Sequence, residues 1–200
     1  MPLFTPNNLG VAAALTHLFA YWLYYKATRR GEIQPNVSAW LMALIINVAQ
    51  TALYADLTKL DITDNLLQVV CTIFSIIIFF LALHKGRSFG NVSWIDVTAL
   101  LINCGAITTW LYYRSPEWGS VIMGVADVAS FIPILWTTWL DPRRERSVPW
   151  VWWTVAYGLL TTSTILEQDY WESIFPGMNL ILHLMIALLA LRVTRRVKKV

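Results

Sequence analysis

Asp127 is an acidic residue about nine positions into a long apolar stretch. An ionised carboxylate at that depth of a membrane costs at least a few kcal/mol, so the group should stay protonated until water reaches it. A carboxyl group in this situation can exchange a proton when a conformational change opens a path to solvent. The alternative is a protonated aspartate that joins two helices by a hydrogen bond worth about 1 kcal/mol. The first interpretation predicts proton coupling at Asp127.

Uncharged polar side chains lie at similar depths in other apolar stretches. Hydrocarbon contains no water, so each such group needs a protein partner or a wet cavity. We expect a binding site for a small polar solute built from Asn47, Asn65, Asn103, Asn179, His17 and His183. Each histidine is equally compatible with packing in the core. The three histidines and two cysteines lack metal-ligand spacing, so we expect no metal and no other cofactor.

Helical spacing places several of these side chains on shared faces. His17, Tyr21 and Tyr24 recur at i, i+4 and i+7 of one stretch, and Asn179 and His183 at i and i+4 of another. If these faces lie opposite one another, they enclose a central cavity.

Pro133 lies six residues after Asp127 in the same stretch. It removes a backbone hydrogen bond to the carbonyl of Ala129, and this predicts a kink. The kink would serve either as a hinge for alternating access or as a static packing feature.

The elements that carry these residues are long and apolar. Of the 200 residues, 57% are hydrophobic and 14% charged, against about 45–50% and 25% in ordinary globular chains. This composition, with a mean hydropathy of +0.55, excludes a large water-soluble enzyme, a nucleic-acid binder and a disulfide scaffold. Seven stretches are long enough to be transmembrane helices: 9–26, 36–56, 65–84, 93–113, 118–140, 148–166 and 173–193.

The charges predict how these helices cross the membrane. Of the 15 basic residues, 13 follow the first, third, fifth and seventh stretches, and only Lys59 and Arg114 lie on the other side. Because cytoplasmic loops carry an excess of lysine and arginine, the N-terminus is expected outside and the C-terminus in the cytoplasm. Tryptophans near the predicted cytoplasmic ends suggest an aromatic belt at headgroup level: Trp40, Trp94, Trp136, Trp139, Trp150, Trp152 and Trp153.

The chain also resembles itself after a shift of 114 residues. The shift gives ten identities over positions 10–77, including Arg29-Arg30 on Arg143-Arg144 and Asn65 on Asn179. The predicted units are a three-helix repeat over 1–87, a linker helix over 88–114, and a second three-helix repeat with a basic tail over 115–200. An even number of helices separates equivalent positions, so the two repeats are parallel.

This 3+1+3 arrangement resembles the SWEET and PQ-loop superfamily of seven-helix membrane proteins, in particular its bacterial members. Phe131-Ile132-Pro133-Ile134, Trp139, Asp141-Pro142 and Glu145 resemble the proline-bearing helix and following loop of PQ-loop proteins. The first repeat keeps Pro35 but lacks the helix proline, and neither repeat has a Pro-Gln pair. The resemblance implies a solute carrier in which paired asparagines on helices 3 and 7 help bind substrate; Asn65 and Asn179 correspond to that pair.

We therefore expect an all-α, multi-pass protein of the bacterial cytoplasmic membrane that carries a sugar, an amino acid or a vitamin precursor. The alternative is a non-transporting receptor or scaffold of the same fold. The expected partners are the solute and membrane lipid but not nucleic acid. The sequence is compatible with either a monomer or a homo-oligomer. A retinal photoreceptor would need a lysine in the middle of the seventh helix, where the chain has none. No protease or hydrolase motif occurs, so we expect no enzyme activity.

Overall fold

A computed structural model describes residues 5–57, 62–85, 92–113, 115–168 and 170–192. These residues form seven α-helices and one short 3₁₀ helix, without a strand. All seven predicted helices are therefore confirmed as helices, with ends within about three residues of the predicted ones. They are α1 (Pro6–Arg29), α2 (Val37–Leu57), α3 (Ile62–His84), α4 (Trp94–Tyr113), α5 (Pro116–Leu140), η2 (Pro142–Arg144), α6 (Ser147–Leu166) and α7 (Tyr170–Ala190).

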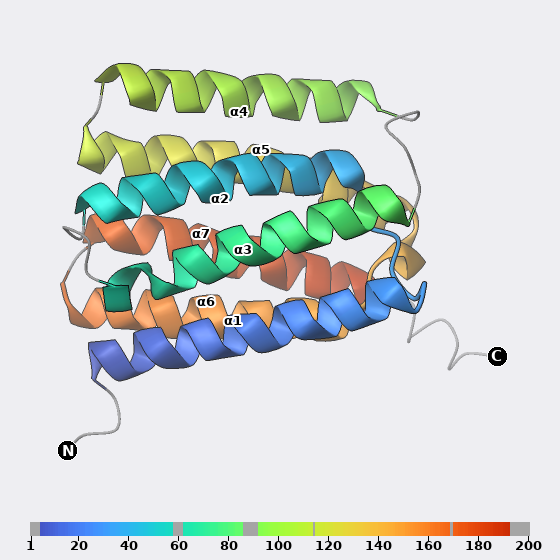
Figure 1. Ribbon diagram of the computed structural model, residues 1–200, viewed down its shortest axis with the longest axis horizontal. Coiled ribbons are helices and arrows are strands. Elements are labelled where there is room, and N and C mark those ends of the chain that lie inside the picture. The colour runs from blue at the N-terminus through green and yellow to red at the C-terminus, as the bar shows by residue number, and fades with distance from the viewer. Residues whose placement is uncertain (1–4, 58–61, 86–91, 114, 169, 193–200) are drawn as a thin grey trace.

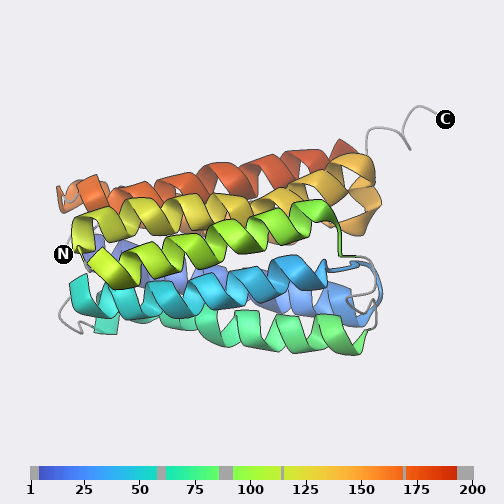
Figure 2. The ribbon, with the colours of Figure 1, turned by 90° about the horizontal axis from the view of Figure 1, so that it is seen from above.

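Successive helices run in opposite directions along one common axis (Figure 1). The first helix therefore starts at one end of the bundle, and the last helix finishes at the other (Figure 1). The view from above shows the same alternation, and α4, which lies along the upper side in Figure 1, is nearest the viewer (Figure 2).

Six of the helices form a closed ring. The third helix packs against α1 and α2, and the seventh packs against α5 and α6. Two further contacts close the ring, α1 against α6 and α2 against α5. The fourth helix lies outside this ring, where it packs against α5 and α2. Side chains on the inner faces of the six helices therefore converge on the middle of the bundle.

Capping side chains fix where several helices begin. The side-chain oxygen of Asn36 accepts a hydrogen bond from the backbone of Ala39 (3.1 Å) at the start of α2. At the start of α4, Ser93 and Asp96 bond each other's backbone N–H groups, at 3.3 and 2.8 Å. These contacts satisfy helix N–H groups that have no partner within the helix.

Four helices contain segments long and apolar enough to cross a membrane: Leu66–His84, Trp94–Tyr113, Val121–Leu140 and Glu172–Ala190. In α2 the apolar part is the shorter segment Val37–Leu53. The described residues of α1 and α6 contain no segment that meets the same length and hydropathy requirement. Large apolar side chains such as Leu15, Phe80 and Leu101 are exposed on the outside of the bundle.

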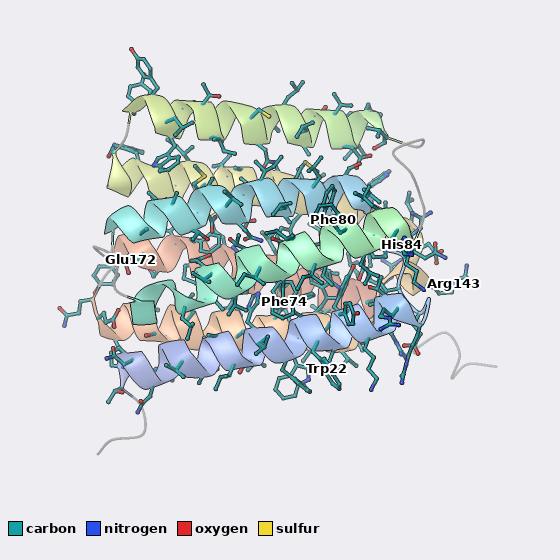
Figure 3. The ribbon with its side chains drawn as sticks, viewed as in Figure 1. Trp22, Phe74, Phe80, His84, Arg143 and Glu172 are labelled. Carbon is teal, nitrogen blue, oxygen red and sulfur yellow. The ribbon has the colours of Figure 1, made fainter. Side chains whose placement is uncertain are left out.

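Every lysine and arginine in the described part of the chain lies at one end of the bundle, which we call the basic end. They follow α1 and α3, surround η2 or end α7: Lys26, Arg29, Arg30, Lys85, Arg143, Arg144, Arg146 and Arg192. Figure 3 shows Arg143 and His84 at this end, and Glu172 at the opposite end.

The aromatic belt predicted at the basic end is only partly present. Trp94, Trp136 and Trp139 are exposed, as a belt requires. Trp22 is also exposed and points away from the bundle (Figure 3). By contrast, the side chains of Trp40, Trp150 and Trp153 are buried in the core, so the belt interpretation was wrong for these three. Position near a helix end does not reveal which face of the helix a residue occupies.

Candidate functional site

A cavity of about 40 Å³ lies in the middle of the ring, between α1, α2, α5, α6 and α7. A water molecule needs about 10–15 Å³ on this measure, so the cavity has room for about three waters. Its walls are His17, Tyr21, Ala39, Trp40, Ala43, Asn47, Asp127, Ser130, Phe131, Ile134, Trp150, Trp153, Tyr157, Asn179 and His183.

One side of the cavity is polar and is built by α5 and α7. The side-chain amide of Asn179 donates a hydrogen bond of 2.5 Å to the Asp127 carboxyl group. One turn further along α7, His183 Nδ1 donates to the backbone carbonyl of Asn179 (2.8 Å). All three side chains are buried. The helical spacing of Asn179 and His183 thus places both on the face that meets Asp127.

Another part of the cavity wall is aromatic and is centred on Trp153 of α6. Its ring centroid lies 4.9 Å from that of Trp150 and 5.0 Å from that of Tyr21. Trp40 of α2 packs against the same ring at 6.3 Å. Three helices therefore contribute to one aromatic cluster, which we define as Tyr21, Trp40, Trp150 and Trp153.

Two buried nitrogen atoms of the cavity wall have no hydrogen-bond partner among the described residues: Trp153 Nε1 and His17 Nδ1. The other nitrogen of His17 lies 3.3 Å from Cys71 Sγ. Unpaired buried polar atoms are uncommon because each costs about 1–3 kcal/mol. Both atoms belong to residues that line the cavity, where a polar partner could satisfy them.

Glu145 joins the two halves of the bundle at the basic end, next to the cavity. Its carboxyl group accepts hydrogen bonds from Tyr24 (3.1 Å) on α1 and from the Trp150 indole (2.9 Å) on α6. The Tyr24 hydroxyl in turn accepts one from the Trp40 indole (3.2 Å). Burial of the Glu145 carboxyl group raises its pKa to about 8, although these hydrogen bonds act in the opposite direction. We call these four residues the Glu145 network.

Five of the expected site residues line the cavity together: His17, Asn47, Asp127, Asn179 and His183. His17, Tyr21 and Tyr24 all face the interior, as their spacing predicted.

Asn103, which the sequence analysis expected at the site, is not among the described residues that line the cavity. It is buried on α4, where its amide donates to the carbonyl of Ala99 (2.8 Å) and lies 3.9 Å from Met42 Sδ. The reason is that α4 packs outside the ring. Depth along a helix alone did not distinguish a cavity-facing asparagine from one between helices.

Two other expectations concern α3 and α5. Asn65 is in α3, but its side chain lies outside the described part of the structure. Pro133 lies inside α5, which continues to Leu140. The hydroxyl of Thr137 donates to the Pro133 carbonyl (2.8 Å) one turn later.

Sequence reasoning placed Tyr21 on a cavity-facing surface but missed the tryptophans of the aromatic wall and Ser130, and it cited Glu145 only for the family resemblance. A signal for the aromatic wall was present, because Trp150, Trp153 and Tyr157 recur at i, i+3 and i+7 of α6. No local pattern identifies Glu145, since it lies in a loop and becomes buried only through contacts with α1 and α6.

Comparison with known proteins gave no match to a protein-family model, a curated protein or a solved structure. Among the described residues, no three histidine, cysteine, aspartate or glutamate side chains gather as a metal site would require. The arrangement is therefore interpreted from its own geometry.

Proposed function

We propose that this protein is a membrane carrier for a small polar solute, such as a sugar, an amino acid or a vitamin precursor. The single observation that supports this function is the buried polar cavity in the centre of the ring, with Asp127 and Asn179 hydrogen-bonded in its wall. Ligand sites favour such places between helices, where a few polar groups converge within apolar walls.

In this proposal the cavity is a binding site in its closed state. Sites for small molecules commonly enclose about 300–1,000 Å³, whereas this cavity encloses about 40 Å³. Solute entry therefore requires the helices to move apart. Proline in the interior of α5 and α7, at Pro133 and Pro176, would allow these helices to bend during that motion. The Glu145 network would have to open for entry from the basic end.

Seven membrane-spanning helices in a 3+1+3 arrangement of parallel repeats are part of the proposal. Supporting it, α3 packs between α1 and α2 just as α7 packs between α5 and α6. Three pairs of cavity-lining residues are also separated by the 114-residue shift: His17 and Phe131, Ala39 and Trp153, and Ala43 and Tyr157. Two of these pairs combine a small residue with a large aromatic one. The site would thus lie on the axis between the repeats, as in the SWEET-like arrangement.

We place the basic end in the cytoplasm and the N-terminus outside, in the cytoplasmic membrane of a bacterium. The concentration of lysine and arginine at one end of the bundle supports this orientation. We further propose that Asp127 couples transport to protons, since it is the one acidic residue among the described cavity-lining positions.

Uptake by purified protein in liposomes tests the proposal. Labelled sugars, amino acids and vitamin precursors are offered to the parent and to two variants with changes on α2. Ala43→Leu adds bulk inside the cavity, whereas Val48→Leu adds bulk at a position that is 50% exposed on the outside. We expect Val48→Leu to take up the same solute as the parent, and Ala43→Leu to lose at least tenfold in rate.

Two results would contradict the proposal. Equal uptake by parent and Ala43→Leu would show that the solute does not pass through this cavity. No uptake of any solute above that of empty liposomes, with folded protein present, would favour the non-transporting receptor or scaffold.

A further inference from the structure

We infer that the solute is a small organic ammonium cation that binds between the Asp127 carboxylate and the aromatic cluster, in exchange for a proton. This inference rests on the proposed carrier function and specifies the chemical class of its solute. It follows from the charge of the cavity, from the aromatic side chains that line it and from the two unpaired nitrogen atoms.

The charge balance of the cavity is one-sided. Asp127 is buried, and no lysine or arginine occurs among the described residues that line the cavity. Its side-chain hydrogen bonds are to uncharged groups, the amide of Asn179 and the hydroxyl of Ser130. A buried carboxylate without a compensating charge is costly, so it must be neutralised by a proton or by a cation. A cationic solute in the cavity would supply the positive charge that the Asp127 carboxylate requires.

The aromatic part of the cavity wall suits an organic cation better than a metal ion. Tryptophan and tyrosine rings attract cations through their negative faces, and this attraction strengthens when water is excluded. The four aromatic side chains of the cluster and Phe131 line the cavity together with Asp127. Small inorganic ions instead prefer a shell of oxygen ligands. Such a wall would favour an ammonium group that carries methyl or methylene groups.

The unpaired nitrogen atoms indicate a second feature of the solute. Trp153 Nε1 carries a hydrogen and can only donate, so it needs an acceptor. A hydroxyl or carboxylate oxygen on the solute would provide one. A compact amino alcohol satisfies both requirements, since its cationic nitrogen would face Asp127 and its oxygen would face Trp153.

Other titratable groups surround Asp127 on several helices. The described ones that face the cavity or its edge are His17 and Tyr21 on α1, Cys71 on α3, Tyr157 on α6 and His183 on α7. On α2 the cavity-lining residues are Ala39, Trp40, Ala43 and Asn47, none of which titrates. Of the surrounding groups, only the two histidines can become cationic, and an ammonium solute would compete with them for the carboxylate.

Binding of the solute exchanges one proton for one cation at Asp127. The O–H bond of protonated Asp127 breaks, its proton passes to water on the side from which the cavity is open, and the carboxylate that remains pairs with the ammonium ion. No bond forms to the solute. One proton leaves for each cation bound, so net charge in the cavity does not change.

Thermal unfolding of the purified protein tests this inference with a pair of probes of matched shape. Choline carries a quaternary nitrogen where 3,3-dimethylbutan-1-ol carries a carbon atom. Methylammonium and tetramethylammonium extend the series in size, and sodium chloride at equal ionic strength controls for salt. We expect at least one ammonium probe to raise the midpoint by several degrees, because a ligand that binds only the folded state stabilises it. The neutral alcohol should have no such effect.

Variants locate the site. Asp127→Asn should abolish the shift produced by the ammonium probe, whereas Asp141→Asn should keep it, because Asp141 is outside the cavity in the loop at the basic end. Titration calorimetry in two buffers of different ionisation enthalpy should show release of about one proton per bound cation.

The inference is overturned if the alcohol stabilises as well as choline, if sodium alone gives the shift, or if Asp127→Asn keeps it. It is also overturned if no ammonium probe shifts the midpoint. In each case uptake of an uncharged solute that is sensitive to Ala43→Leu would leave the proposed carrier function standing. Absence of uptake of every solute by the folded parent protein would instead contradict the carrier function itself.

Discussion

Glu32 and Arg146 form an ion pair across the basic end, and they are separated by the same 114 positions that relate the two halves of the sequence. Beside them, the backbone N–H of Gln34 donates to the carbonyl of Arg144 (3.0 Å). The loop after α1 thus meets the loop after α5. In the proposed parallel repeats, residues 114 positions apart would be related by a two-fold axis that passes between this pair.

Cross-linking should capture this contact. With Cys104 replaced by alanine, we expect the double variant Glu32→Cys, Arg146→Cys to be joined by a short bifunctional thiol reagent in membranes, as seen by a mobility shift on gels. The remaining native cysteine, Cys71, is buried. The control pair is Glu32→Cys with Glu172→Cys. Glu32 pairs with Arg146 at the basic end, whereas Glu172 lies at the opposite end (Figure 3), so these two thiols should not be joined. Efficient joining of the control pair would contradict the fold.

Glu145 should make stability depend on pH. Burial raises its pKa from 4.5 to about 8, so between these values the folded protein binds more protons than the unfolded chain. The contribution of Glu145 to stability should therefore be greatest below pH 4.5. It should fall as the pH rises to about 8, by an amount on the order of a few kcal/mol. Unfolding midpoints measured across this range should decline for the parent and change much less for Glu145→Gln.

Asp141 provides a control in the same loop with the opposite sign. Hydrogen bonding to Arg143 lowers the pKa of its exposed carboxyl group, so its contribution is present at neutral pH and is lost on acidification. Asp141→Asn should leave the decline between pH 5 and 8 in place. If Glu145→Gln declines as steeply as the parent, another group causes the effect.

Gly119 of α5 packs so closely against neighbouring helices that an added methyl group should lower stability. A Cβ atom on Gly119 would lie 2.8 Å from Leu53 and 3.1 Å from the Trp110 ring, whereas one on Gly105 would meet nothing within 4 Å. We expect Gly119→Ala to lower stability by about 1–3 kcal/mol, and Gly105→Ala to raise it by about 0.5–1 kcal/mol. Chemical denaturation in detergent measures both. Equal effects would mean that α4 does not pack against α5 as described.

The helices could be predicted because hydrophobic length and charge are local properties of the sequence. The same holds for caps such as Asn36 and for the shared face of His17 and Tyr21, which follow from spacing within one segment. Burial of the Glu145 carboxyl group could not be predicted in this way. Its partners Tyr24 and Trp150 lie on different helices, and only the assembled bundle brings them together.

The candidate site was predictable to the extent that depth along a helix determines it. Depth indicates Asp127, whereas Asn179 is indicated by its correspondence to Asn65 in the repeat, and the structure makes Asp127 and Asn179 partners. Asn103 met the depth criterion but is on the helix outside the ring. Trp153 was assigned to the surface because it is near a helix end. In both cases the deciding property was which face turns inward, and this depends on how the helices pack.

Substitution of Asp127 separates its role in coupling from a role in packing. Asp127→Asn keeps the size of the side chain and an oxygen that can accept from Asn179, so we expect an unfolding midpoint within a few degrees of the parent. Asp127→Leu removes that acceptor and leaves Asn179 with only its 3.3 Å bond to the Phe175 carbonyl. We expect it to lower stability by about 1–3 kcal/mol. Unfolding of the detergent-solubilised variants gives both values.

Transport by the same asparagine variant tests coupling directly. An amide cannot release a proton, so uptake driven by a pH gradient should disappear in Asp127→Asn, measured as solute accumulation in liposomes above the external concentration. Exchange without a gradient then distinguishes the solutes, because an uncharged solute would still exchange through the cavity, whereas an ammonium cation would lack its counter-charge and exchange at least tenfold more slowly. Accumulation that survives in Asp127→Asn would exclude proton coupling at this residue and leave its hydrogen bond to Asn179 as a packing contact between α5 and α7.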